Sequence, residues 1–116
     1  MQINLIVIRT RDQKKLADFF TLLGCKFEYH SHNTGPMHYS ARIDQTILEI
    51  YPLAKGQAEP DRHLRLGFVL DIFDDVIETL RANGIKFLSQ PVQTEWAFMA
   101  IIEDPDSRKV EIHRRQ

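Results

Sequence analysis

Cysteine is almost absent from this sequence, glycine is sparse, and neither sign of charge is in excess. A single cysteine, Cys25, excludes an intrachain disulfide and is typical of a protein in a reducing compartment. We expect Cys25 to act as a small buried apolar residue. The five glycines are scattered, so no glycine-rich phosphate-binding loop is indicated. A formal net charge of -1 gives no field that would favour nucleic acid or an anionic membrane as a partner.

Long apolar runs are missing as well. The N-terminal segment carries no basic leader, and its apolar stretch is too short for a signal peptide or a membrane span. We therefore expect a cytoplasmic protein. The chain has 116 residues, of which 43% are hydrophobic and 27% charged, and this is typical of one folded domain with a sizeable core.

The C-terminal end of the chain predicts a β-hairpin. Strand-forming runs at 99–102 and 109–113 flank a D-P-D-S sequence at 104–107. Proline presets φ and aspartate hydrogen-bonds to nearby backbone, so this sequence favours a tight turn. Glu111 lies in the middle of the second run, with β-branched neighbours pointing to the opposite face. A carboxylate at such a position is a candidate functional residue.

Apolar periodicity in the rest of the chain predicts two helices and further strands. Asp12 is a candidate N-cap for a helix that ends before Gly24, and Asp74 lies at the start of a second helix that ends before Gly84. The expected strands are 3–10, 25–30, 37–43, 46–51 and 64–70, followed by the two strands of the hairpin.

The second half of the chain repeats the first. A shift of 60 residues aligns Gly24 with Gly84, and a shift of 62 aligns Glu49 with Glu111 within similar strand segments. The two-residue difference falls in loops, where insertions are tolerated. A repeat of this length predicts a duplicated βαβββ module.

The duplicated module, with a glutamate near the end of each half and a D-P-D-S turn before the second, resembles the vicinal oxygen chelate superfamily. That superfamily includes glyoxalase I, bleomycin-resistance proteins and extradiol dioxygenases. The resemblance implies a single α+β domain over residues 1–116, with two tandem βαβββ modules that form a curved, cleft-enclosing mixed sheet with the helices outside. Module 1 would span about 1–52, a linker about 53–62 and module 2 about 63–116. Small members of the superfamily commonly form homodimers.

The resemblance also implies where a metal would bind, since the first and fourth strands of each module supply the ligands in metal-using relatives. The matching positions here are Leu5, Glu49, Arg65 and Glu111. Leucine has no donor atom, and a guanidinium group is a cation at any ordinary pH. We therefore expect the usual metal site to be degraded and no cofactor to be needed. Our hypothesis is that Arg65 takes the place of the ion and bridges the two glutamates.

An alternative retains a divalent metal such as Zn, Ni, Mn or Fe. His63 lies two residues before Arg65 and shares its strand face, so a two-residue change of register would bring an imidazole to the site. Glu49, His63 and Glu111 would then form a three-ligand site in a divergent lyase, isomerase or dioxygenase.

Four further residues are candidates for the ligand-binding cleft. Tyr51 and His113 each follow a glutamate by two residues and point to the same side, either to hydrogen-bond a ligand or as polar residues of the cleft rim. Trp96 and Phe98 alternate onto one face of the seventh strand. They form either an aromatic wall for a planar ligand or packing beneath the helices.

Three histidines, His30, His32 and His38, lie around a polar loop at 31–36. Their spacing matches no rigid metal-site template, so we expect solvated surface residues.

These observations favour a protein that binds a small organic molecule in its cleft, with Arg65 orienting an anionic or carbonyl-bearing ligand. They leave open whether any reaction is catalysed. Glyoxalase I activity is disfavoured, because metal activation of its substrate needs the full ligand set. A third alternative is a vestigial cleft filled by side chains.

Overall fold

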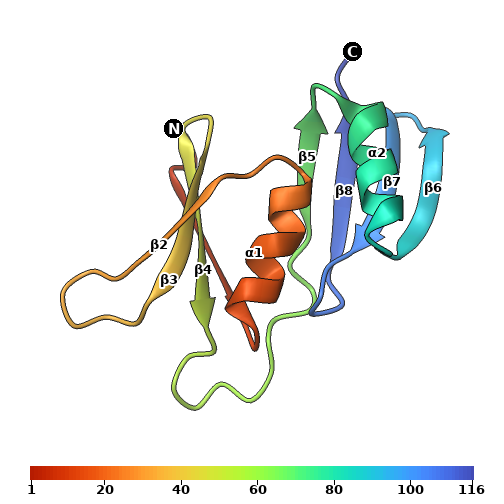
Figure 1. The fold of residues 1–116 in the computed structure, drawn as a ribbon. Helices are drawn as coiled ribbons and strands as arrows, with labels where there is room; N and C mark the ends of the chain where they lie inside the picture. Colours follow the sequence, from red (N-terminus) through yellow and green to blue (C-terminus); the bar gives the residue numbers. More distant parts are fainter. The chain divides into compact units, whose positions relative to one another are not determined.

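The computed structural model describes every residue from 1 to 116. The chain divides into two compact units, Met1–Pro60 and Asp61–Gln116, here called the first and second modules. Each contains one helix and one four-stranded sheet in the same order along the chain (Figure 1). The predicted duplication of a βαβββ unit in an α+β fold is therefore confirmed.

The first module has the spatial strand order β1-β4-β3-β2. β1 runs parallel to β4, and the other neighbouring strands are antiparallel, so the sheet is mixed. Its elements are β1 Leu5–Thr10, α1 Gln13–Leu22, β2 Phe27–His30, β3 His38–Ile43 and β4 Thr46–Pro52.

The second module repeats this topology with the order β5-β8-β7-β6, and β5 runs parallel to β8. Figure 1 shows α2 lying across one face of this sheet. The elements are β5 Leu66–Leu70, α2 Phe73–Ala82, β6 Phe87–Gln93, β7 Phe98–Glu103 and β8 Lys109–Arg114. Neither helix of the protein is long and apolar enough to cross a membrane.

The helix ends follow the local chemistry of the sequence. The Asp12 side chain accepts a hydrogen bond from the Lys15 backbone N–H at 3.0 Å and so caps α1. Gly24 and Gly84 follow the two helices with φ of 112° and 70°, a region that an L side chain rarely adopts. α2 has no side-chain cap at Ile72, but its first turn holds acidic residues that suit the helix dipole.

Strand alternation gives each sheet a core face and an open face. In the first module, Leu48 and Ile50 of β4 are buried on the side of α1 together with Leu16 and Phe20 of that helix. The second module follows the same rule, with buried residues from β8 and from α2 forming its core. The odd-numbered residues of β4 and β8 therefore point to the open faces.

The hairpin between β7 and β8 is closed by a buried ion pair. Oδ1 of Asp104 accepts hydrogen bonds from the backbone N–H groups of Asp106 and Arg108, as expected for an aspartate-initiated turn. The guanidinium of Arg108 bonds the carboxylates of Asp104 and Asp106 at 3.0 Å and the carbonyl of Asp61 at 2.7 Å. Ser107 has φ of 69°, in the left-handed region that favours glycine.

Candidate functional site

The open face of the first sheet carries polar residues around Glu49. The register places Val7 of β1 and Ser40 of β3 on either side of this glutamate, and Tyr51 is the next residue of β4 on the same face. The Glu49 side chain is only 13% exposed. Its Oε2 lies 3.2 Å from Nε2 of His38, which is the one close ionic partner of Glu49 within the module.

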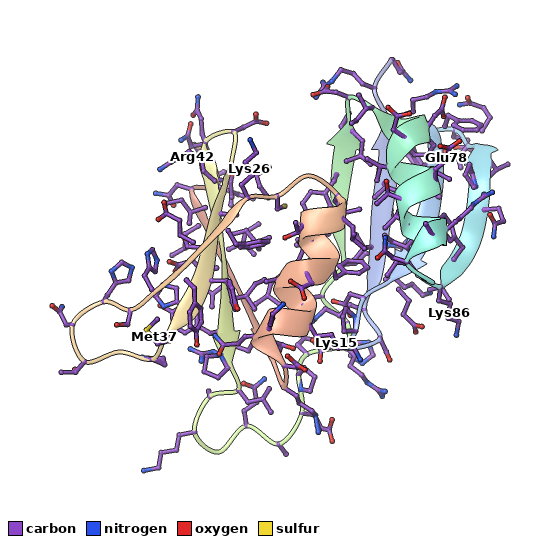
Figure 2. All side chains as sticks on the ribbon, viewed as in Figure 1. Lys15, Lys26, Met37, Arg42, Glu78 and Lys86 are labelled. Carbon is purple, nitrogen blue, oxygen red and sulfur yellow. The ribbon has the colours of Figure 1, made fainter.

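Two more histidines complete a group at this end of the sheet, here called the first-module cluster. His30 pairs with His38 across β2 and β3, and His32 follows in the loop that joins these strands. Figure 2 labels Met37 in that loop, and Lys26 and Arg42 at the other end of the same two strands. One ligand atom from each member of the cluster lies within 4.8 Å of the others. The members are His30, His32, His38 and Glu49.

The expectation that these histidines are solvated surface residues is wrong for two of them. His38 is 1% exposed, and His30 is partly buried. His32 alone is exposed as expected. The local spacing gave no sign of this, because the antiparallel pairing of β2 with β3 folds the loop back and brings both strand ends together.

The equivalent glutamate of the second module has a different environment. Oε2 of Glu111 accepts a hydrogen bond from Nε of Arg65 at 2.7 Å and forms an ion pair with Nη2 of the same guanidinium at 2.6 Å. Oε1 of Glu111 lies 3.0 Å from Nε2 of His113. The hydrogen bond with His113 holds the pKa of the Glu111 carboxyl below its ordinary value, and Arg65 acts in the same direction while burial opposes both.

Replacing His113 by alanine is expected to raise the pKa of Glu111, because the largest stabilising contact of the carboxylate is lost. The folded-state pKa of Glu111 lies below its unfolded value. Ionised Glu111 therefore stabilises the fold above the unfolded pKa, and this contribution is lost as the pH falls through the folded pKa. Carboxyl ¹³C chemical shifts followed in a pH titration measure the change. An unaltered Glu111 midpoint in His113→Ala, equal to that of the control His63→Ala, would contradict the assignment.

Part of the Arg65 guanidinium has no hydrogen-bond partner. The Nη1 amino group makes no hydrogen bond, and the side chain is 42% exposed. A hollow of about 450 Å³ lies beside it, entirely within the second module. Its lining residues are Arg62, His63, Leu64, Arg65, Ser107 and Lys109.

Arg65 contacts Glu111, and the hypothesis that Arg65 replaces a metal stays a prediction. Its proposed bridge to Glu49 stays a prediction, and Glu49 already has the imidazole of His38 beside it. Leu5 is exposed on the open face of β1 and offers no donor atom. The four family positions therefore do not fit a divalent ion, because only two of the four can supply a ligand.

Of the remaining predicted residues, Phe98 lies in β7, whereas Trp96 and His63 lie outside the strands of the second sheet. Phe98 packs against Phe73 of α2 with ring centroids 5.7 Å apart and lies beneath the guanidinium of Arg114. Of the two alternatives for Phe98, the structure therefore shows packing on the helix side, and its assignment to the cleft is corrected. Trp96 precedes β7 and is 78% exposed. His63 is exposed before β5, and its side chain makes no contact with Glu111.

Comparison with known proteins shows the family to which this chain belongs. The model of the Glyoxalase/Bleomycin resistance protein/Dioxygenase superfamily matches residues 2–112. The chain belongs to this superfamily, as its duplicated modules and paired glutamates predicted.

Individual relatives are distant. The uncharacterized protein YetH of Bacillus subtilis (strain 168) is 26% identical over 109 residues, which cover 90% of this chain and 91% of that protein. TnmS3, an antibiotic-binding protein from Streptomyces sp. CB03234, is 20% identical with a TM-score of 0.80 and coverage of 100% and 97%. The oxidase ChaP-H2 is 20% identical with a TM-score of 0.75 and coverage of 100% and 94%. At these identities the two solved structures share the fold, which by itself assigns no activity.

Proposed function

We propose that the protein binds a small organic molecule with a carboxylate or similarly anionic group, and that Arg65 holds this group without a metal at the four family positions. The observation that carries the proposal is the guanidinium of Arg65, anchored by Glu111 and bordering a hollow of about 450 Å³. An anchored guanidinium with a free amino group is preorganised for an oxyanion.

The charge around the hollow supports an anionic ligand. Arg62, Arg65 and Lys109 are cations, and no carboxylate is among the lining residues. Glu111 orients Arg65 and offsets part of its charge. Arg62 and Lys109 then make the electrostatic potential of the hollow positive. The volume suits a ligand of drug-like size, since binding clefts commonly measure about 300–1,000 Å³.

A relative of the same fold supports a binding role. TnmS3 is an antibiotic-binding protein, so this architecture accommodates an organic ligand in at least one distant relative. In our chain the catalytic alternative with Glu49, His63 and Glu111 has no supporting contact, because Glu111 is occupied by Arg65 and His113. The homodimer and the cytoplasmic location expected from the sequence stay predictions.

Thermal denaturation with a panel of aromatic carboxylates, each paired with its uncharged carboxamide, tests the proposal. A carboxylate present at 100 times its dissociation constant is expected to add about 2.7 kcal/mol to the free energy of unfolding. The matched carboxamide is expected to add little, because it cannot form the ionic contact.

Arg65→Gln is the decisive variant, since glutamine keeps much of the side-chain length and removes the charge. It is expected to abolish the stabilisation by the carboxylate. Arg42→Gln, on the first sheet and also exposed, is the matched control and is expected to respond like the natural protein. A carboxylate that stabilises Arg65→Gln as strongly as the natural protein would refute the role of Arg65.

A further inference from the structure

The first-module cluster brings three imidazoles and one carboxylate to one place. His30 and His38 are held by the paired ends of β2 and β3, Glu49 by β4, and His32 by the loop. The three histidine rings lie pairwise with centroids 4.8 to 5.1 Å apart. Packing at such separations brings several ring nitrogens, each a possible metal ligand, into one small volume.

The hydrogen bonding of His38 shows where its lone pair points. Nδ1 lies 3.1 Å from the carbonyl oxygen of Pro36, which only accepts, so Nδ1 carries a proton. In a neutral ring, Nε2 then has a lone pair, and this atom lies 3.2 Å from Oε2 of Glu49. Nε2 is buried and makes no hydrogen bond. Two acceptor atoms at this distance need a proton or a metal cation between them.

His30 repeats the pattern. Its Nε2 is also buried without a hydrogen bond, and its Nδ1 faces the carboxylate of Glu28 at 3.9 Å. In metal sites the ring nitrogen that does not bind the ion commonly faces a carbonyl or a carboxylate, which fixes the tautomer. His38 with Pro36 has this arrangement at hydrogen-bond distance, whereas Nδ1 of His30 lies beyond hydrogen-bond distance from Glu28.

Neighbouring groups hold the imidazole ring of His38 in place. Tyr51 stacks on His38 with ring centroids 4.3 Å apart and an interplanar angle of 10°. Arg9 in turn lies over the Tyr51 ring and donates a hydrogen bond to the carbonyl of Pro52. His38 is thus fixed on its face by Tyr51 and at Nδ1 by Pro36, which preorganises Nε2 toward Glu49.

We propose that the first-module cluster is a binding site for one transition-metal ion, with Zn²⁺ the best match to three imidazoles and a carboxylate. Four such ligand atoms placed tetrahedrally around Zn²⁺ at about 2.0–2.2 Å lie about 3.3–3.6 Å apart. The ligand atoms of the cluster already lie within 4.8 Å of one another. His32 belongs to an exposed loop, so rotation of this side chain closes the remaining distance and gives the ion a path from solvent.

The site differs from the metal position of the family. It lies within one module and shares with the family positions only Glu49, whereas Leu5, Arg65 and Glu111 take no part. The second module provides an internal contrast, because strand pairing places Val92 and Met99 where the first module has His30 and His38. The imidazole beside Glu111 is that of His113 on the same strand, and only the first of the two duplicated sheets has this cluster.

Metal binding by the full-length protein without a polyhistidine tag tests the proposal. The protein is stripped with a chelator, dialysed and titrated with Zn²⁺ in competition with a chromophoric chelator. We expect one ion per chain, and with Co²⁺ we expect the visible absorption of a tetrahedral centre. His32→Gln and Glu49→Gln are each expected to weaken Zn²⁺ binding roughly tenfold or more. His32 is exposed, so its variant is expected to fold normally, as circular dichroism would verify.

Glu111→Gln and His63→Gln are the matched controls, and both are expected to bind Zn²⁺ like the natural protein. Failure to bind one ion per chain would overturn the proposal. Equal binding by His32→Gln and Glu49→Gln would overturn it as well. Weaker binding in the two controls would also overturn it, because neither residue belongs to the cluster. None of these outcomes depends on the organic ligand proposed above.

Discussion

Arg108→Met is expected to lower the free energy of unfolding by about 3–5 kcal/mol, as found when one partner of a buried ion pair is removed. Arg108 is 2% exposed, and its guanidinium bonds both Asp104 and Asp106. Its Nε also donates to the carbonyl of Asp61, so the residue joins the start of the second module to the β7–β8 turn. Methionine fills similar space but leaves the buried carboxylate of Asp104 without its counter-charge.

Urea denaturation measures the effect, with Arg62→Met as the matched control. Arg62 is exposed, and its replacement is expected to change the free energy of unfolding by no more than about 0.5 kcal/mol. Arg108→Lys retains a positive charge but loses the fixed set of donors, so an intermediate loss is expected. If Arg108→Met is as stable as Arg62→Met, the ion pair does not hold the hairpin.

Leu80→Ala is expected to cost about 2–5 kcal/mol of stability through the cavity that it leaves. Leu80 lies in α2 with no exposed surface, on the buried stripe that also includes Val76 and Ile77. The second module is small, so the surrounding side chains have little freedom to close the space. Denaturant unfolding again provides the measurement.

Leu88→Ala is the control for this substitution. Leu88 lies in β6 and is 41% exposed, so the same chemical change removes few packed contacts. A loss well below 1 kcal/mol is expected. Equal losses for the two variants would mean that the helix does not pack on its sheet as described.

Local chemistry explains why most elements could be predicted. Asp12 caps α1 as expected, and the glycines at 24 and 84 follow the helices with positive φ. The D-P-D-S turn forms where proline and aspartate favour it. Each of these features depends on contacts between residues close in sequence, so its signal is present in a short window.

Side-chain environments that depend on long-range pairing were harder to predict. The sequence left Phe98 on either face of the sheet, because it does not tell which set of alternate strand residues faces the helix. The buried role of Arg108 was not foreseen: two of its partners, Asp104 and Asp106, are close in sequence, but the carbonyl of Asp61 is 47 positions away along the chain. The charge and size of an arginine are typical of an exposed residue, so the residue type gave no sign of burial.

The sequence by itself determined the duplication, the two glutamates and the absence of a metal-donor side chain at Leu5 and Arg65. These are matters of residue identity and spacing, which no packing can alter. Only the tertiary structure decided that the first-module cluster is partly buried and converges on Glu49. Its members come from three strands and one loop. They meet only because of the register of the sheet, which is set by the packing of residues distant in sequence and not by local sequence.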